Sequence, residues 1–204
     1  MNGTQAGNEV RKITPADFGK VEEVVAKAFY DDPVMRFFLP ADDVRGERLR
    51  QFMGVALRKI TYPYGETYVE STYRGAALWN PPNQRPHGIL SDLSLMPAML
   101  RFAGLSGLPR IMQSFSLIEG KHPKEAHYYL LAIGVDPSSQ GQGLGTRLMA
   151  PVLERCDTDR APAYLEASSE RSAALYERNG FKVIEELKLP RGGPPIWRMW
   201  REPQ

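Results

Sequence analysis

The sequence predicts a mixed α/β fold with helices on both faces of a central sheet. Apolar runs bounded by turn residues predict strands, most clearly at 128–135 and 163–167. Other segments carry apolar residues at helical spacing, which predicts amphipathic helices. A hairpin, a β-α-β-α unit and two final strands follow one another in that order. This order indicates a mixed, mostly antiparallel sheet of about six to seven strands.

The N-terminal half begins with a short strand and a helix whose start is well marked. Thr14 is a good helix cap, and Pro15 and Asp17 suit a first turn. Asp31-Asp32-Pro33 should end this helix. The elements expected here are a strand at 10–13, a helix from Thr14 to Phe29, a helix over about 44–59, and hairpin strands at 67–71 and 75–79.

The C-terminal half alternates strands and helices before it ends in two strands. Asn179-Gly180 suits a left-handed helix end. The elements expected are helices near 90–102 and 108–117, a strand at 128–135, a helix at 146–155, a strand at 163–167, a helix at 170–178, and strands at 181–187 and 196–201. We expect residues 1–8 to be disordered and residues 9–204 to form one domain with a helical insertion at about 84–118.

The composition excludes several classes of function. The chain has 204 residues, 42% hydrophobic and 25% charged, as expected of a soluble globular domain. A net charge of +2 gives no support to a nucleic-acid surface. The single Cys156 cannot form an internal disulfide, and no metal site is predicted. No segment resembles a signal peptide or a membrane span, so we expect a cytoplasmic protein without membrane contact.

The most informative segment is the glycine-rich stretch Gln140-Gly-Gln-Gly-Leu-Gly145. It lies between the strand at 128–135 and the helix at 146–155, where unpaired backbone N–H groups and the helix dipole attract an anion. Glycines allow a phosphate to approach the backbone closely. The spacing differs from the G-x-G-x-x-G of dinucleotide folds, and no Gly-Lys-Ser/Thr follows, which excludes a P-loop.

Two motifs together resemble the GCN5-related N-acetyltransferase (GNAT) family. They are Gln140-x-x-Gly143-x-Gly145 and Ala174-Leu-Tyr-Glu-Arg-Asn-Gly-Phe181. The resemblance implies an acetyltransferase fold that binds acetyl-CoA where two parallel strands separate at a β-bulge, for which Gly134 is well suited. It implies that Tyr176 is the general acid for the departing thiolate, a role that suits a phenol. The coenzyme-binding residues that it implies are Ile133, Gly134, Val135, Gln140, Gly141, Gln142, Gly143, Leu144, Gly145, Thr146, Ser169, Ser172 and Tyr176.

The wider similarity is to the branch of the family that contains puromycin N-acetyltransferase. Pro194-Pro-Ile-Trp-Arg-Met199 and Ala77-Leu-Trp-Asn-Pro-Pro82 are among the segments that carry it. Gln140 replaces a frequent arginine, and Ser169 or Ser172 replaces a frequent asparagine. The similarity is poor over 84–118, where acceptor specificity is expected, so puromycin itself is not implied.

The acceptor amine must lose a proton before it attacks, which requires a base. Glu125 and His127 are the candidates just before the central strand, and Glu119 and His122 lie further off. A water chain could serve instead. The resemblance places the acceptor pocket near the end of the first helix, and the substrate residues that we expect are Phe29, Tyr30, Asp31, Asp32 and Trp79.

The sequence therefore predicts an N-acetyltransferase that moves the acetyl group of acetyl-CoA to a primary amine of a small molecule. Three alternatives stay open: a non-catalytic acyl-CoA sensor, a protein N-acetyltransferase, and another nucleotide-binding α/β protein. The expected partner is the small amine alone, in a monomer or a homodimer.

Overall fold

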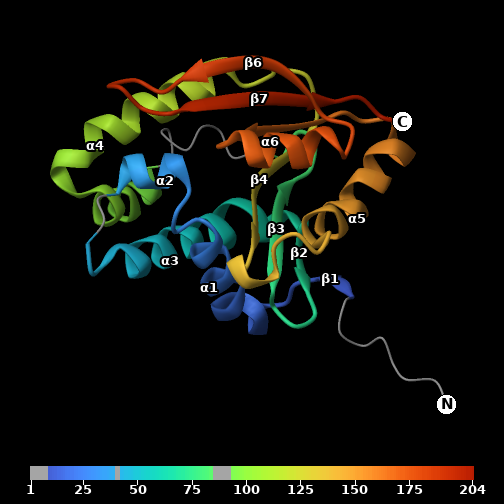
Figure 1. The fold of residues 1–204 in the computed structure, drawn as a ribbon, viewed down its shortest axis with the longest axis horizontal. Coiled ribbons are helices and arrows are strands. Elements are labelled where there is room, and N and C mark those ends of the chain that lie inside the picture. The colour runs from blue at the N-terminus through green and yellow to red at the C-terminus, as the bar shows by residue number, and fades with distance from the viewer. Residues whose placement is uncertain (1–8, 40–41, 85–92) are drawn as a thin grey trace.

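The strands form one continuous sheet in the order β1-β2-β3-β4-β5-β7-β6 (Figure 1). The computed structural model describes residues 9–39, 42–84 and 93–204. All neighbouring strands are antiparallel except β4 and β5, which are parallel. The strands are β1 (Val10–Lys12), β2 (Thr67–Glu70), β3 (Gly75–Asn80), β4 (Tyr128–Val135), β5 (Ala163–Ala167), β6 (Lys182–Lys188) and β7 (Pro195–Arg201). The predicted fold class is confirmed.

Helices cover both faces of this sheet. One face of β3 and β4 packs against α1, and α5 packs against the other face (Figure 1). The helices are η1 (Pro15–Asp17), α1 (Phe18–Ala28), α2 (Pro33–Phe38), α3 (Arg45–Val55), η2 (Ala56–Thr61), η3 (Tyr62–Tyr64), η4 (Leu93–Leu95), α4 (Met96–Lys121), η5 (Pro137–Ser139), α5 (Leu144–Asp159) and α6 (Glu170–Glu177). Because both faces are covered, every residue of β2 and β3 is buried.

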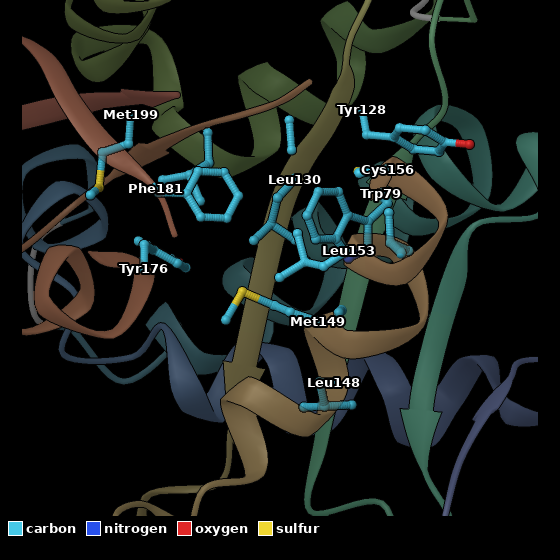
Figure 2. Close-up of a cluster of buried hydrophobic side chains, with 14 of the residues drawn as sticks. Trp79, Tyr128, Leu130, Leu148, Met149, Leu153, Cys156, Tyr176, Phe181 and Met199 are labelled. Atoms are coloured by element: carbon cyan, nitrogen blue, oxygen red, sulfur yellow. The ribbon is translucent and has the colours of Figure 1, made fainter. Parts of the chain in front are cut away.

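The core under α5 is the larger of the two layers that hold the sheet. Figure 2 shows Met149 and Leu153 of α5 beside Leu130 and Trp79, with Leu148 of the same cluster further along the helix. Each large apolar side chain buried in this way contributes about 1.5–3 kcal/mol to folding. This layer fixes α5 against the sheet and therefore fixes the loop that precedes it.

Two elements differ from the prediction. The short helix α2 follows Asp32 directly, where the sequence indicated only a break. The two helices expected near 90–102 and 108–117 form α4, which is interrupted at Gly104 with φ 66° and ψ 173°. Residues 1–8, expected to be disordered, and residues 85–92 of the expected insertion lie outside the described residues.

Candidate active site

The parallel strands β4 and β5 separate after a short stretch of pairing. Backbone pairs join Tyr128–Leu130 to Ala163–Leu165 and extend no further between these two strands. β4 continues to Val135, whereas the rest of β5 pairs only with β7. The edge of β4 beyond Leu130 therefore faces a gap in the sheet. Backbone groups there can pair with an extended ligand.

A β-bulge lies at the point where the strands separate. On β3, Trp79 is opposite Leu130 and the preceding Leu78 is opposite Ala132, so Leu131 is the extra residue. A bulge bends its strand and increases the local twist. The separated strands with a bulge, which the resemblance implied, are thus present.

The interpretation of Gly134 as the site of this distortion is wrong. A Cβ at Gly134 would lie 2.9 Å from the Cβ of Ala28 and 3.1 Å from the Cα of Val25. These distances are too short for any side chain. The glycine is therefore needed for the close approach of α1 to β4, and the bulge lies three residues earlier.

The glycine-rich loop has the geometry of an anion site. Gly141 and Gly143 have φ of 78° and 73°, and a Cβ on either would meet nothing within 4 Å. Gly143 caps α5, and the first intrahelical bond runs from the N–H of Arg147 to the Gly143 carbonyl at 3.2 Å. The N–H groups of residues 144–146 precede that bond and have no acceptor within the helix, next to the positive end of the helix dipole.

The side chains of this loop mostly hold it in place. The amide of Gln140 donates to the Val135 carbonyl at 3.2 Å, and the Thr146 hydroxyl accepts from Asn179 at 3.2 Å. Leu144 is in the core, and a Cβ at Gly145 would lie 2.9 Å from the side chain of Leu175. Gln142 is exposed. We therefore expect these residues to contact a phosphate through the backbone.

Arg147 is a residue that the sequence reasoning missed. It lies in the first turn of α5, and its Nε is buried without a hydrogen-bond partner among the described residues. A cation near the positive end of a helix is electrostatically unfavourable on its own. That misplaced charge was the available signal, because a bound anion would satisfy both the helix end and the guanidinium.

Tyr176 comes from α6 and reaches the gap between β4 and β5. Its side chain is 7% exposed, packs against Phe181, and contributes to the wall of a cavity at the gap. Burial raises the pKa of Tyr176, and the carboxylate of Asp32 raises it further. The phenol is therefore protonated at neutral pH, as a proton donor must be.

The two serines expected to contact the coenzyme hold the start of α6. Ser169 is its N-cap, and the Ser169 hydroxyl accepts from the N–H of Ser172 at 3.2 Å. The hydroxyl of Ser172 lies 3.2 Å from the N–H of Ser169 and accepts from it. This reciprocal pair is a capping box, and it orients the helix that carries Tyr176.

The cavity beside the gap has apolar walls and an acidic edge. It encloses about 1290 Å³, part of which is open to solvent. Its polar lining includes Asp32, Glu119, Glu166, Tyr129 and Ser168. The apolar walls come mainly from α2, α3, η2, α4 and β4. Such a cavity can bind an ammonium group carried on an apolar body.

Asp32 both caps helix α2 and lines the cavity. One oxygen caps α2 by accepting from the N–H groups of Val34 at 2.9 Å and Met35 at 3.0 Å. The other accepts a short hydrogen bond from Ser168. Burial raises the pKa of Asp32, although these hydrogen bonds oppose the shift.

The other residues expected at the acceptor pocket are divided between the cavity and elsewhere. Phe29 lines the cavity with Asp32. Tyr30 is 42% exposed under the guanidinium of Arg45, and Asp31 is exposed. Trp79 is fully buried in the core under α5, on the other face of the sheet (Figure 2). For Tyr30, Asp31 and Trp79 the structure therefore corrects the predicted place.

Of the expected bases, Glu119 lines the cavity, whereas Glu125, His122 and His127 do not. The side chain of Glu125 is exposed, and this residue contributes only its carbonyl, which lies 2.6 Å from Nδ1 of His127. His127 is buried and packs its ring against Tyr129. The Glu125 side chain is exposed and does not line the cavity, and its role as the base stays a prediction.

Glu166 is the carboxylate that the sequence reasoning missed. It lies on β5, lines the cavity, and accepts from the hydroxyl of Tyr129 at 2.9 Å. Its side chain is only 11% exposed. A glutamate in the middle of a predicted buried strand was the available signal, since carboxylates are rarely buried without a reason.

Comparisons with known proteins agree with this geometry. The model of the acetyltransferase (GNAT) family matches residues 56–181, more than half of the chain. The chain belongs to the GNAT family of acetyltransferases. An uncharacterized N-acetyltransferase of Schizosaccharomyces pombe is 25% identical over 208 residues, covering 95% of this chain and 83% of the relative.

Solved structures share the fold. A Corynebacterium glutamicum structure, described as histone acetyltransferase HPA2 and related acetyltransferase, superposes with a TM-score of 0.73 at 27% identity, covering 97% of each chain. An agmatine N-acetyltransferase superposes with a TM-score of 0.63 at 16% identity, covering 96% of this chain and 99% of that one. The closer resemblance to the puromycin N-acetyltransferase branch stays a prediction. Within the described residues, no helix has the length and apolar character needed to span a membrane.

Proposed function

We propose that this acetyltransferase moves the acetyl group of acetyl-CoA to the primary amine of a small molecule with an apolar or aromatic body. One observation carries the proposal. At the gap between β4 and β5, a single cavity brings together Tyr176, the carboxylates of Asp32 and Glu166, and apolar walls. These are the groups needed to hold an ammonium ion beside a departing thiolate.

Acetyl-CoA is the expected donor because members of this family use it and the residues present fit it. The N–H groups at the start of α5 and the open space over Gly141 and Gly143 suit a pyrophosphate. The unpaired edge of β4 beyond Leu130 suits the extended pantetheine arm. When bound, this donor would supply the thioester that the amine attacks.

The cavity favours an amine with a hydrophobic body over a small polar one. Asp32 and Glu166 attract the ammonium, and a hydrogen bond to a charged group contributes about 1.5–3 kcal/mol. Phe38, Phe52 and Met99 offer apolar contact to the rest of the molecule. Holding amine and thioester together in this way supplies much of the rate enhancement.

Protein acetylation is a second candidate function. The Corynebacterium glutamicum structure, which carries the name of a histone acetyltransferase, is similar over nearly the whole chain. Against this, α4 contributes several side chains to the cavity wall and leaves a pocket rather than an open groove. A non-catalytic acyl-CoA sensor is a third candidate function. Such a sensor would not need a proton donor, and the position of Tyr176 in the cavity wall argues against it. A cytoplasmic location, and a monomer or homodimer, stay predictions.

The test is a panel of acceptor amines with acetyl-CoA, with release of the coenzyme thiol and acetylation followed by mass spectrometry. The panel contains arylalkylamines, aminonucleosides, polyamines, aminoglycosides and a peptide with a free amino terminus. We expect arylalkylamines or aminonucleosides to be the best acceptors. Exclusive acetylation of spermidine or of the peptide would contradict the proposal. The thiol readout is unaffected by the protein, because burial raises the pKa of Cys156 to about 12.

Asp32→Asn tests the acidic edge, with Asp31→Asn as a matched control. Asparagine is also a good cap, so α2 should stay folded in the Asp32 variant. Loss of one charged hydrogen bond should raise KM for an alkylammonium acceptor about tenfold or more. Asp31 is exposed, and its variant should retain the wild-type KM. Equal effects of both substitutions would contradict the assignment of Asp32.

A further inference from the structure

Glu166, His122 and His127 form a chain of neighbouring polar groups inside the protein, starting at the cavity wall. Nδ1 of His122 lies 3.7 Å from Oε1 of Glu166, and its Nε2 lies 3.0 Å from Nε2 of His127. Nδ1 of His127 lies 2.6 Å from the carbonyl of Glu125. Tyr129 and Tyr164 pack against both rings, so their orientations are fixed. This chain of groups runs from the cavity wall to the exposed segment at 124–126.

The hydrogen-bond partners determine where the protons lie. A carbonyl can only accept, so His127 carries its proton on Nδ1 and offers a lone pair on Nε2. His122 must then donate its Nε2–H to that lone pair. This leaves Nδ1 of neutral His122 with a lone pair, and that atom faces a carboxylate oxygen of Glu166, which also only accepts.

Nδ1 of His122 and Oε1 of Glu166 therefore face each other as two acceptors with no proton between them. Both Nδ1 of His122 and Oε1 of Glu166 are buried, and neither has a hydrogen-bond partner among the described residues. Their separation of 3.7 Å is longer than a hydrogen bond, whereas a shared proton would bring such atoms to about 2.7–2.9 Å. A buried polar group without a partner is costly, so the pair gains stability when a proton arrives.

We infer that Glu166 and His122 together accept the proton of the acceptor ammonium, and that His127 is a positioning residue that fixes the tautomer of His122. The inference rests on the proposed function and names its general base. Glu166 lines the cavity and is the member that meets the amine. Its other oxygen already accepts from the hydroxyl of Tyr129 at 2.9 Å, so Oε1 is the atom left for the proton.

The protons balance as follows. The ammonium gives one proton to the Glu166–His122 pair and becomes a neutral amine with a free electron pair. Its nitrogen forms the C–N bond to the thioester carbonyl carbon, the C–S bond breaks, and Tyr176 gives its proton to the sulfur. The nitrogen releases a second proton, which restores Tyr176. The products are an amide, a free thiol and one proton, which the Glu166–His122 pair releases to solvent after the products leave, so that both histidines keep their tautomers.

Glu166→Gln tests the base with two acceptors that share one apolar body. One is an arylalkylamine, which is protonated at neutral pH. The other is its alkoxyamine analogue, which is largely unprotonated and needs no base before attack. At saturating acceptor, where lost attraction of the ammonium affects only KM, we expect Glu166→Gln to lower kcat about 10²–10⁴-fold for the alkylamine and by less than about tenfold for the alkoxyamine. An equal loss with both acceptors, or no loss with the alkylamine, would overturn the inference.

The same variant separates a base from a merely structural carboxylate. A glutamine amide can accept from Tyr129 and donate to Nδ1 of His122, which supplies the missing proton. We therefore expect the thermal midpoint of Glu166→Gln to equal or exceed that of the wild type while the activity is lost. A clearly lower midpoint would mean that Glu166 holds the fold, and would overturn the inference.

Nitrogen NMR of labelled histidines tests the tautomers without any turnover. In the resting protein we expect neutral His122 protonated on Nε2 and His127 protonated on Nδ1. In His127→Phe the ring is kept but the acceptor is lost, and His122 should lose its fixed tautomer. The opposite tautomers, or an unchanged His122 signal in that variant, would overturn the inference. If instead the wild type acetylates none of the amines, the proposed function fails while these NMR signals can still be as expected.

Discussion

At the scale of single residues, the role of Tyr176 as general acid can be tested by removing its hydroxyl. Burial and the nearby Asp32 keep it protonated, and it lies at the gap where the thiolate is expected. Tyr176→Phe should lower turnover about 10²–10⁴-fold while acetyl-CoA affinity changes little, because only the proton donor is removed. Stopped-flow turnover and calorimetric binding of acetyl-CoA measure the two effects separately.

Tyr128→Phe is the matched control for that experiment. Tyr128 is also buried, but its hydroxyl donates to Asp159 at the end of α5, and the residue does not line the cavity. Its variant should keep full turnover once folding is verified. If Tyr176→Phe stays within about twofold of the wild-type turnover, the residue serves packing alone, and the general-acid assignment fails.

Individual site residues were predictable to the extent that a motif or a local contact determines them. Tyr176 follows from its place in Ala174–Phe181, and it does lie at the gap. Glu166 carried a signal as a glutamate within a predicted buried strand, but its role depends on the separation of two strands and on histidines from another segment, which that signal does not give. Trp79 was misplaced because the face of β3 on which it lies depends on the register across the bulge.

At the scale of elements, the loop before α5 is the part that should bind the coenzyme phosphates. Gly143→Asp places a carboxylate where phosphate is expected, and Gly143→Asn is the uncharged control of the same shape. Asparagine tolerates a positive φ better than most residues, so both variants should fold. We expect acetyl-CoA Kd to rise at least tenfold more in the aspartate variant, about 1.4 kcal/mol, as measured by calorimetry. Equal Kd values in the two variants would contradict the assignment of this loop as the phosphate-binding site.

The start of α1 offers a test of stability and its pH dependence. Buried Asp17 accepts from Arg11 at 2.7 Å and from Tyr73 at 2.6 Å, and it closes a capping box with Thr14. The hydrogen bond from Arg11 holds the pKa of Asp17 well below its usual range. Its contribution to stability is thus complete above the unfolded pKa of about 3.9 and is lost as pH falls toward the folded pKa.

Asp17→Asn should accordingly lower the free energy of unfolding by about 1–3 kcal/mol at pH 7. The deficit relative to the wild type should shrink once pH falls below about 4, because the wild-type carboxylate then loses its advantage. Urea unfolding of both proteins at pH 7 and at pH 3 measures this difference. A deficit that is the same at both pH values would show that charge is not the cause.

Most elements could be predicted from the sequence because their signals are local. The bounds predicted for β4 and β5 agree with the structure, since apolar runs and turn residues define both ends. Helix α2 was missed because its six residues are too few for a periodic pattern. The bulge at Leu131 was placed at Gly134 because a glycine signals conformational freedom, whereas here it serves close packing.

At the scale of the whole molecule, the site lies between two halves of the sheet. Backbone pairing of Tyr128–Leu130 with Ala163–Leu165 is the junction between strands β1–β4 and strands β5–β7. The apolar walls come mainly from helices before β4, whereas Tyr176 and Glu166 follow it in the chain. Figure 1 shows α5 on one side of β4, α2 and α4 on the other, and α6 across the strand. This arrangement allows donor and acceptor to approach from different sides.

The order of strands and the gap between β4 and β5 could not be obtained from residue patterns alone. Apolar runs and turn residues predicted the strands, and only the family resemblance predicted that two parallel strands separate. Local sequence does not determine which strands pair, because pairing depends on the helices that cover each face. The family resemblance placed the acceptor pocket near the end of the first helix, where Phe29 and Asp32 line the cavity, whereas the other walls come from distant segments that the sequence does not bring together.

The central claim is that acetyl transfer takes place in the gap between β4 and β5. A crystal structure of the protein with coenzyme A and an acetylated arylalkylamine tests it most directly. We expect the pyrophosphate on the N–H groups that follow Gly141 and Gly143 at about 2.7–3.2 Å, and the sulfur within about 4 Å of the Tyr176 hydroxyl. The amide nitrogen should lie on the side of Glu166. A coenzyme bound elsewhere, or a sulfur distant from both Tyr176 and Glu166, would contradict the account.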